Sequence, residues 1–168
     1  MTATAAPESI TVARANAPHV AVIGAGLAGL VTALRLRRAG ARVTLVTKGV
    51  GGLQLGHGTI DLLGYDPERV TNPAKGIEAF AAKHPEHPYA KIGVEAVRSG
   101  VELLSEILGE KLVNGSADEN VLVPTAVGAA RPTAFIPESM KAGVLHGDAK
   151  RVIIGVAQYK DFHPSLIA

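Results

Sequence analysis

Cysteine is absent from this chain of 168 residues, and so is tryptophan. Without cysteine the chain forms no disulfide, no thiolate nucleophile and no cysteine-ligated iron–sulfur cluster of its own. Aromatic residues make up only 4 % of the chain, and the formal net charge is only +2. No basic stretch alternates with aromatics, so the sequence gives no reason to expect nucleic acid as a partner.

A secretion signal and a long hydrophobic run are also lacking. Residues 1–17 have neither the basic start nor the continuous apolar core of a signal peptide, and we expect them to be a mobile leader of small residues. The apolar run from Val20 to Leu34 is shorter than the roughly 20 residues that a membrane-spanning helix needs, and glycines interrupt it. We therefore expect a cytoplasmic protein without a transmembrane helix.

Hydrophobic residues form 47 % of the chain, enough for a buried core, and their pattern is clearest near the start. The continuous apolar run Val20–Ile23 predicts a parallel strand covered on both faces. Apolar residues at helical spacing then predict a helix over Leu27–Ala39, with Gly40 as a left-handed cap. "RVTLVT" predicts a second strand over Arg42–Thr47, which completes a βαβ unit.

Further elements are predicted along the rest of the chain. The pattern favours an α/β fold in which the βαβ unit is followed by helices and a small β-hairpin region. The hairpin lies outside the parallel sheet, and the apolar "KRVIIGVAQYKDF" predicts another strand near the end. The predicted helices are Pro73–Lys83 and Val94–Leu108, and the two β-like runs are Val121–Thr125 and Thr133–Ile136.

The motif "GAGLAG" joins the first strand to the helix. Gly24 permits the tight turn, Gly26 lets the backbone approach a pyrophosphate, and Gly29 allows close packing of helix on strand. The backbone N–H groups at the start of the helix, at Leu27 and Ala28, then face the anion. A glycine-rich helix that binds nothing is the alternative, and the flanking strands disfavour it. We therefore expect a Rossmann-like, FAD- or NAD(P)-binding βαβ unit.

An acidic residue normally ends the second strand of such a unit and binds the ribose hydroxyls of an adenine dinucleotide. Here Thr47 and Lys48 stand in its place. A threonine hydroxyl can bond a ribose, and a lysine can attract a phosphate, so a flavin dinucleotide and a 2′-phosphorylated nicotinamide cofactor both stay open. The alternative for Lys48 is a solvated loop charge.

A glycine-rich loop, "GGLQLGHGTIDLL", follows the second strand. Gly58 permits close backbone approach to a ring system and Thr59 can donate a hydrogen bond, although an ordinary surface loop is the alternative. His57 and Asp61 are the other polar groups there, and we assign no catalytic residue. We interpret "HPEHPY", which holds His84 and His87, as a turn and not as a metal site, because prolines break the helix and no other ligands cluster there.

Several segments together resemble the B subunit of anaerobic glycerol-3-phosphate dehydrogenase, a flavoprotein-type subunit. The resemblance covers nearly the whole chain after the leader. Its first segments are shared by many flavoproteins, in some of which a hydroxyl residue followed by lysine also replaces the acidic ribose ligand. The segments are "VIGAGLAGL", "VTLVTKG", "GTIDLLGY", "HPYAKIG", "PTAVGAARPTAF" and "RVIIGVAQYKDF".

The resemblance implies an FAD- or FMN-dependent oxidoreductase that converts sn-glycerol 3-phosphate to dihydroxyacetone phosphate and passes electrons toward quinone. The implied partners are a catalytic flavoprotein A subunit and an iron–sulfur C subunit, and the implied location is the inner face of the cell membrane, held through those partners. The family is commonly assigned FMN, whereas the glycine motif is the device for a dinucleotide such as FAD. By the same resemblance the cofactor-binding residues are Gly24, Gly26, Leu27, Ala28, Gly29, Thr47, Lys48, Gly58 and Thr59.

Members of that family are more than twice as long, and their C-terminal portion completes the sheet and the flavin site. We therefore expect residues 18–168 to be the N-terminal part of an incomplete doubly wound domain, with a cap or substrate domain beginning near residue 110 and with exposed apolar surface. Two other interpretations stay open: an NAD(P)-binding dehydrogenase, which Lys48 favours, and a truncated, non-catalytic fragment.

Overall fold

The computed structural model describes residues 16–109, 112–147 and 150–167, and it divides into two compact units at the bond between His57 and Gly58. The expected leader lies outside the described residues, apart from its last two positions. The division at residue 57 is a finding of the structure, and the domain boundary expected near residue 110 stays a prediction.

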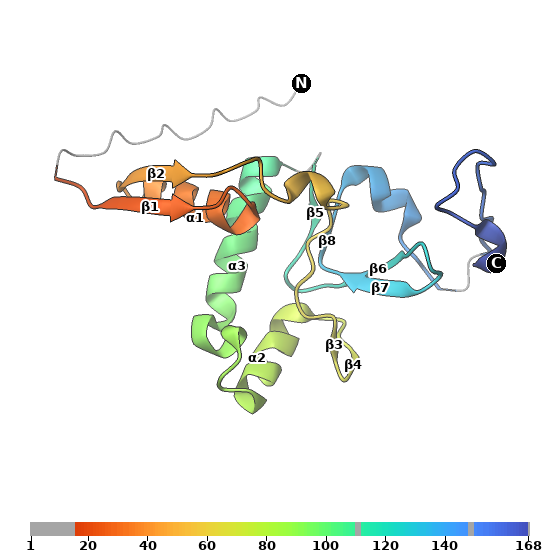
Figure 1. Ribbon diagram of the computed structural model, residues 1–168. Helices are drawn as coiled ribbons and strands as arrows, with labels where there is room; N and C mark the ends of the chain where they lie inside the picture. Colours follow the sequence, from red (N-terminus) through yellow and green to blue (C-terminus); the bar gives the residue numbers. More distant parts are fainter. Residues whose placement is uncertain (1–15, 110–111, 148–149, 168) are drawn as a thin grey trace, which may run out of the picture. The chain divides into compact units, whose positions relative to one another are not determined.

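The first unit is a single βαβ unit. Strand β1 (His19–Ile23) lies parallel to strand β2 (Arg42–Val46), in a register that pairs His19 with Arg42 and Ile23 with Val46, and helix α1 (Leu27–Arg38) connects them (Figure 1). A short 3-10 turn, η1 (Leu53–Leu55), follows in the loop after β2. The two strands and the helix predicted from the apolar pattern are confirmed.

Gly40 ends α1 in the manner predicted. Its φ is +86°, in the left-handed region that favours glycine. The N–H groups of Gly40 and Ala41 donate back to the carbonyl oxygens of Arg37 and Leu36, at 3.0 and 2.9 Å. These bonds occupy carbonyls at the end of the helix that would otherwise have no partner, and they turn the chain into β2.

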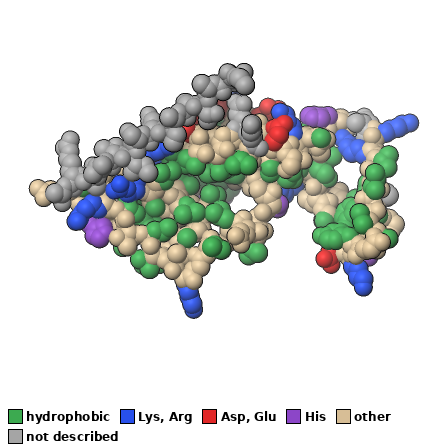
Figure 2. Space-filling view, turned by 90° about the horizontal axis from the view of Figure 1, so that it is seen from above, with side chains coloured by type: hydrophobic (Ala, Val, Ile, Leu, Met, Phe, Trp, Pro, Cys, Tyr) green, Lys and Arg blue, Asp and Glu red, His purple; other side chains and the backbone are tan. Residues whose placement is uncertain are grey.

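Hydrophobic side chains are exposed on the strands of this unit (Figure 2). Ile23 is 86 % exposed and Val46 is 50 % exposed, whereas parallel strands in most proteins are covered on both faces. The strand pair therefore has apolar surface available for further packing, as the sequence led us to expect.

Two helices begin the second unit. Asn72 caps α2 (Pro73–Lys83) by accepting a hydrogen bond from the N–H of Lys75 at 3.0 Å, and α2 has the bounds that the sequence predicts. Helix α3 (Pro88–Leu108) contains the predicted Val94–Leu108 but starts earlier and is kinked at Gly93, where φ is +76°. The earlier start was missed because Pro88 was interpreted as a helix breaker, whereas proline is well suited to the first position of a helix.

The strands of the second unit form short antiparallel pairs. β3 (Tyr65–Asp66) pairs with β4 (Glu68–Arg69), β5 (Asn114–Gly115) with β8 (Phe135–Ile136), and β6 (Val121–Pro124) with β7 (Ala130–Thr133). The predicted hairpin exists, but its second strand was placed wrongly at Thr133–Ile136. Residues 133–136 contain the last residue of β7 and all of β8, because at Ala134 the chain passes from the β6–β7 pair to the β5–β8 pair.

The prediction of a strand in "KRVIIGVAQYKDF" is also wrong. Residues 151–156 are irregular, and Val152 and Ile154 are 86 % and 80 % exposed. A strand requires a neighbour for its backbone groups, and no strand in the described ranges pairs with this segment. A short 3-10 helix, η3 (Pro164–Leu166), follows.

The core of the second unit lies between its helices and the β7–β8 segment. Phe135 is its one aromatic member and is 3 % exposed, and Ile60 packs against the cluster from the start of the unit. A second 3-10 helix, η2 (Glu138–Gly143), comes after β8. The buried members of the cluster are Ala74, Val101, Val113, Ala117, Ala134 and Phe135. Among the helices of the described residues, none is long and apolar enough to span a bilayer.

Candidate functional site

The glycine-rich turn between β1 and α1 is the candidate cofactor site. Gly24 directly follows β1 and has a φ of +104°, a backbone conformation that residues other than glycine rarely adopt. Its N–H donates to the carbonyl oxygen of Val46 at 2.8 Å, which ties the turn to the end of β2. The turn therefore sits at the carboxyl ends of both strands, the edge where ligands bind in α/β folds.

Gly29, in the first turns of α1, packs directly on this turn. An alanine Cβ built at position 29 would lie 2.0 Å from the carbonyl oxygen of Gly24 and 3.7 Å from the Val22 side chain. No backbone adjustment of a few tenths of an ångström removes such an overlap. The close packing of helix on strand that the motif predicts is thus present.

Gly26 and the first residues of α1 form an open donor site. Among the described residues, a Cβ at Gly26 would meet no atom within 4 Å apart from its chain neighbours, and no side chain caps the helix there. Leu30 makes the first helical bond, to the oxygen of Gly26 at 3.0 Å, and within the described residues no acceptor takes the N–H groups of Leu27, Ala28 and Gly29. Residues 16–57 also contain no Asp or Glu. Open donors, the positive end of a helix dipole and an absence of negative charge together fit an anion.

Gly51 also contacts this turn, and sequence reasoning did not single it out. Its φ is +70°, and a Cβ there would lie 2.6 Å from the oxygen of Ala25 and 2.7 Å from the nitrogen of Gly26. The loop after β2 therefore crosses the Ala25–Gly26 peptide at close range. The signal in the sequence was the second glycine of "GVGG", but the pattern alone does not distinguish a glycine in contact from a merely flexible one.

Thr47 and Lys48 follow β2 in the structure as the sequence indicated. The Thr47 hydroxyl oxygen accepts a hydrogen bond from the N–H of Gly49 at 3.1 Å and also contacts the Gly49 carbonyl oxygen, so it shapes the local turn. Lys48 is exposed, and no ion pair in the described part of the chain involves it. The proposed ribose contact of Thr47 stays a prediction.

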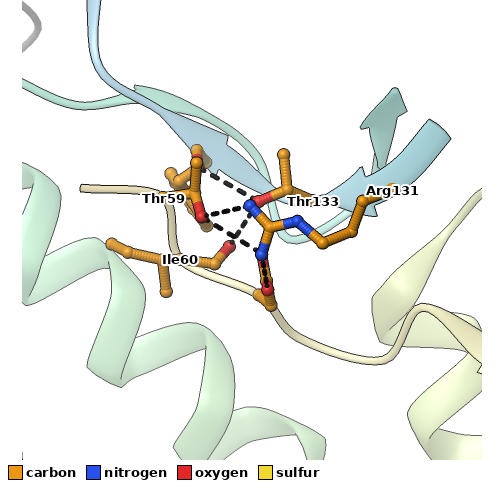
Figure 3. Close-up of polar contacts among 6 residues, drawn as sticks. Thr59, Ile60, Arg131 and Thr133 are labelled. Carbon is orange, nitrogen blue, oxygen red and sulfur yellow. Dashed lines mark hydrogen bonds and ion pairs between the residues drawn. The ribbon is translucent and has the colours of Figure 1, made fainter. Parts of the chain in front are cut away.

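Gly58 and Thr59 belong to the second unit, where their neighbours are different. A Cβ at Gly58 would lie 2.9 Å from Cγ of Pro137. The Thr59 hydroxyl accepts a hydrogen bond from the Arg131 guanidinium at 2.9 Å (Figure 3). The same guanidinium pairs with Asp61 at 2.5 Å. Asp61 is thus part of an ion pair, which supports a structural role for it.

The histidines of "HPEHPY" occupy the connection between α2 and α3. His84 is the C-cap of α2, and His87 caps α3 by accepting a hydrogen bond at Nδ1 from the N–H of Tyr89, at 3.2 Å. Both rings pack against Phe80, with ring centroids 4.3 and 4.8 Å away. The predicted turn is confirmed, and no group of three or more potential metal ligands occurs among the described residues.

The family model described as an FAD binding domain matches residues 19–168, which is most of the chain and includes the glycine turn. This chain belongs to the FAD-binding domain family. Membership favours FAD over FMN as the flavin, in agreement with the glycine motif and with the open helix N-terminus. The fold of an FAD-binding domain is also consistent with the mixed α/β content seen here.

Several curated proteins are similar to this chain over most of its length. The chain is 36 % identical to the B subunit of anaerobic glycerol-3-phosphate dehydrogenase from Yersinia enterocolitica, over 89 % of this chain and 37 % of the relative. It is 35 % identical to the B subunit of the same enzyme from Mannheimia succiniciproducens, over 89 % of this chain and 36 % of the relative. A probable B subunit of that enzyme from Halobacterium salinarum is 33 % identical over 86 % of this chain and 34 % of its own length.

The chain therefore spans little more than a third of the length of these relatives, which are named as subunits of a multi-subunit enzyme. The resemblance to the B subunit of anaerobic glycerol-3-phosphate dehydrogenase that we inferred from the sequence is confirmed. No solved structure matches the chain.

Proposed function

We propose that this chain supplies the dinucleotide-holding part of a flavin-dependent dehydrogenase subunit. In this proposal the enzyme oxidises sn-glycerol 3-phosphate to dihydroxyacetone phosphate, and the two electrons and two protons removed reduce a quinone to a quinol. The observation that carries the proposal is the open set of N–H groups at Leu27, Ala28 and Gly29, next to Gly26, where an added Cβ would meet no atom of the described residues within 4 Å apart from its chain neighbours. The names of the relatives support the choice of substrate.

The residues have distinct roles in this proposal. The N–H groups of Leu27 and Ala28 bind the pyrophosphate of FAD, and Gly26 leaves room for it to approach. Thr47 and Lys48 serve the ribose end, while Gly58 and Thr59 serve the flavin end. When bound, FAD supplies the ring that accepts two electrons from an alcohol and passes them on.

The lack of cysteine supports an assembly with other subunits. Electrons on the way to quinone commonly pass through iron–sulfur clusters, whose ligands are cysteine thiolates, and this chain has none. We therefore propose a catalytic flavoprotein A subunit and an iron–sulfur C subunit as partners. Through them the protein is held peripherally at the inner face of the cell membrane.

Reconstitution tests the substrate. The complete natural polypeptide, purified with its A and C partners, is mixed with sn-glycerol 3-phosphate and a soluble quinone under anaerobic conditions. We expect formation of dihydroxyacetone phosphate and quinol in equal amounts, and loss of both when Gly26→Ala is introduced in this subunit. Turnover that is unchanged by Gly26→Ala contradicts the assigned role.

A nicotinamide-binding dehydrogenase is the second candidate, because Lys48 is exposed where a 2′-phosphate is read in related folds. Titration with NADPH distinguishes the two candidates. Saturable NADPH binding that is weakened by Lys48→Ala favours the nicotinamide candidate, whereas a tightly bound flavin and no NADPH binding favour the flavoprotein.

A further inference from the structure

The second unit contains a cavity of about 400 Å³, a size within the usual range of small-molecule pockets. Part of its lining is apolar and comes from the β7–β8 segment, where Ala134 and Ile136 are both buried. Gly115, on β5, also lines it, and a Cβ there would lie 2.0 Å from the oxygen of Ala134. This part of the lining is therefore tightly packed.

Lys141 and His146 reach the cavity from the segment after β8. Lys141 belongs to η2, and the N–H of Val144 donates to the oxygen of Lys141 at 3.3 Å. The N–H of Leu145 donates to the oxygen of Leu122, on β6, at 2.8 Å. Backbone hydrogen bonds thus fix the chain between Lys141 and His146.

Both side chains have donors to offer. Nζ of Lys141 lies 3.6 Å from a Glu138 carboxylate oxygen, and both of these side chains are more than half exposed. Such an exposed pair contributes little, so the ammonium group can turn to a ligand at small cost. Within the described residues nothing bonds the imidazole of His146, which carries at least one N–H in either protonation state. Two donors, one of them cationic, suit an oxyanion such as phosphate.

Ser116 and Glu119 bring a hydroxyl and a carboxylate to the same cavity. The two residues form an antiparallel bridge across a short turn, and Oγ of Ser116 accepts a hydrogen bond from the N–H of Asp118 at 3.0 Å. Glu119 is exposed, and no ion pair in the described part of the chain involves it. A carboxylate only accepts hydrogen bonds, so it suits the hydroxyl groups of a ligand and repels an anion.

We propose that this cavity binds a short hydroxylated phosphate ester, with the phosphate held by Lys141 and His146 and the hydroxyl groups held by Ser116 and Glu119. The ester sn-glycerol 3-phosphate belongs to this class, and its choice as the probe rests on the proposed function. Glycerol lacks the anion, and inorganic phosphate lacks hydroxyl groups on carbon. Each fragment therefore uses only part of the site and binds more weakly than the ester.

Lys83 provides a matched control. Its side chain is 59 % exposed, against 62 % for Lys141, and it pairs with Asp66 at 3.0 Å. Lys83→Gln and Lys141→Gln each remove one positive charge and one exposed ion pair from the second unit. Only Lys141 lines the cavity, so the comparison separates recognition of the ligand from a general effect of net charge.

Glu138 provides a variant of opposite sign. Its carboxylate competes with the ligand for Lys141, and it accepts a hydrogen bond from the Asn114 side chain at 2.9 Å. In Glu138→Gln the amide oxygen can still accept from Asn114, but the negative charge is gone. We therefore expect Glu138→Gln to bind both phosphate-containing probes more tightly.

The experiment is titration calorimetry on the complete natural polypeptide with sn-glycerol 3-phosphate, inorganic phosphate and glycerol. We expect the ester to bind at least about tenfold more tightly than either fragment. Lys141→Gln and His146→Ala each weaken ester binding about tenfold, whereas Lys83→Gln leaves it unchanged. Glu119→Ala weakens binding of the ester and does not weaken binding of inorganic phosphate.

Two results overturn the inference. One is a loss of ester affinity in Lys141→Gln no larger than that in Lys83→Gln, and the other is an unaltered protein that binds the ester no more tightly than its fragments. Both are measured without turnover and leave the flavin assignment as it stands. A protein that releases no flavin refutes the proposed function instead, so the two failures are distinguishable.

Discussion

Gly29 lies against Gly24 so closely that a single methyl group at position 29 would come within 2.0 Å of the Gly24 carbonyl oxygen. At Gly26, in the same motif, a methyl group would meet no atom within 4 Å in the described part of the chain, apart from its chain neighbours. The packing of the fold therefore requires glycine at position 29, whereas the described atoms leave room for a methyl group at position 26. This difference makes the site testable by substitution.

Gly29→Ala disturbs the fold first. The added methyl group forces α1 away from the turn, and overpacking of this kind costs about 1–3 kcal/mol. We expect a lower unfolding temperature in a thermal melt, together with weaker FAD binding. An unfolding temperature equal to that of the unaltered protein contradicts the packing seen here.

Gly26→Ala removes binding and leaves the fold in place. Its Cβ has open space among the residues that the structure describes, and its φ of −75° is open to any residue. The methyl group instead occupies space in front of the helix N-terminus, where the pyrophosphate would approach. We expect about a tenfold or greater loss of FAD affinity by fluorescence titration, with little change in the unfolding temperature. Unchanged affinity argues against this anion site.

Gly51→Ala and Gly52→Ala are matched variants at neighbouring positions, and we expect only Gly51→Ala to disturb the glycine turn. Position 51 has a φ of +70° and lies against the Ala25–Gly26 peptide, so alanine there pushes the loop off the glycine turn. At position 52 the φ is −87° and a Cβ has open space. Amide hydrogen exchange of residues 24–30 is expected to rise in Gly51→Ala alone. Equal exchange in both variants contradicts a role for Gly51 at the turn.

Acid weakens the second unit in part through Asp118. Hydrogen bonds from Arg98 hold the pKa of Asp118 below its ordinary value of 3.8. A lowered pKa in the folded state means that the stabilisation is complete above that ordinary value and disappears as the pH falls through the lower, folded one. We expect Asp118→Asn to reduce the slope of stability against pH in urea unfolding below about pH 4 and to leave the slope at neutral pH unchanged. A slope identical in both proteins contradicts this contribution.

The local patterns predicted the first unit well because its elements are determined by neighbours in the chain. A continuous apolar run, a helical period and a terminating glycine are all local signals, and β1, α1 and β2 follow them. Helix α2 follows its own signals in the same way, with Asn72 as cap and Pro73 at its first position.

Pairing between distant segments could not be predicted from these patterns. Whether Thr133 ends one strand or begins another depends on which partner lies beside it, and the partners of β7 and β8 are different strands. The terminal apolar segment has β-like residues but no strand beside it among the described residues. In the candidate site, the turn at Gly24 and the close packing of Gly29 follow from the motif itself, whereas the contact of Gly51 with the Ala25–Gly26 peptide and the pairing of Arg131 with Asp61 come from tertiary structure.

The cofactor released from the purified, complete natural polypeptide tests the central claim most directly. The protein is denatured, and the visible absorption and the mass of the released molecule are determined. The account predicts FAD in a one-to-one ratio with the protein, and its absence from the Gly26→Ala variant. A colourless protein, or a tightly bound nicotinamide dinucleotide in place of FAD, would contradict the account.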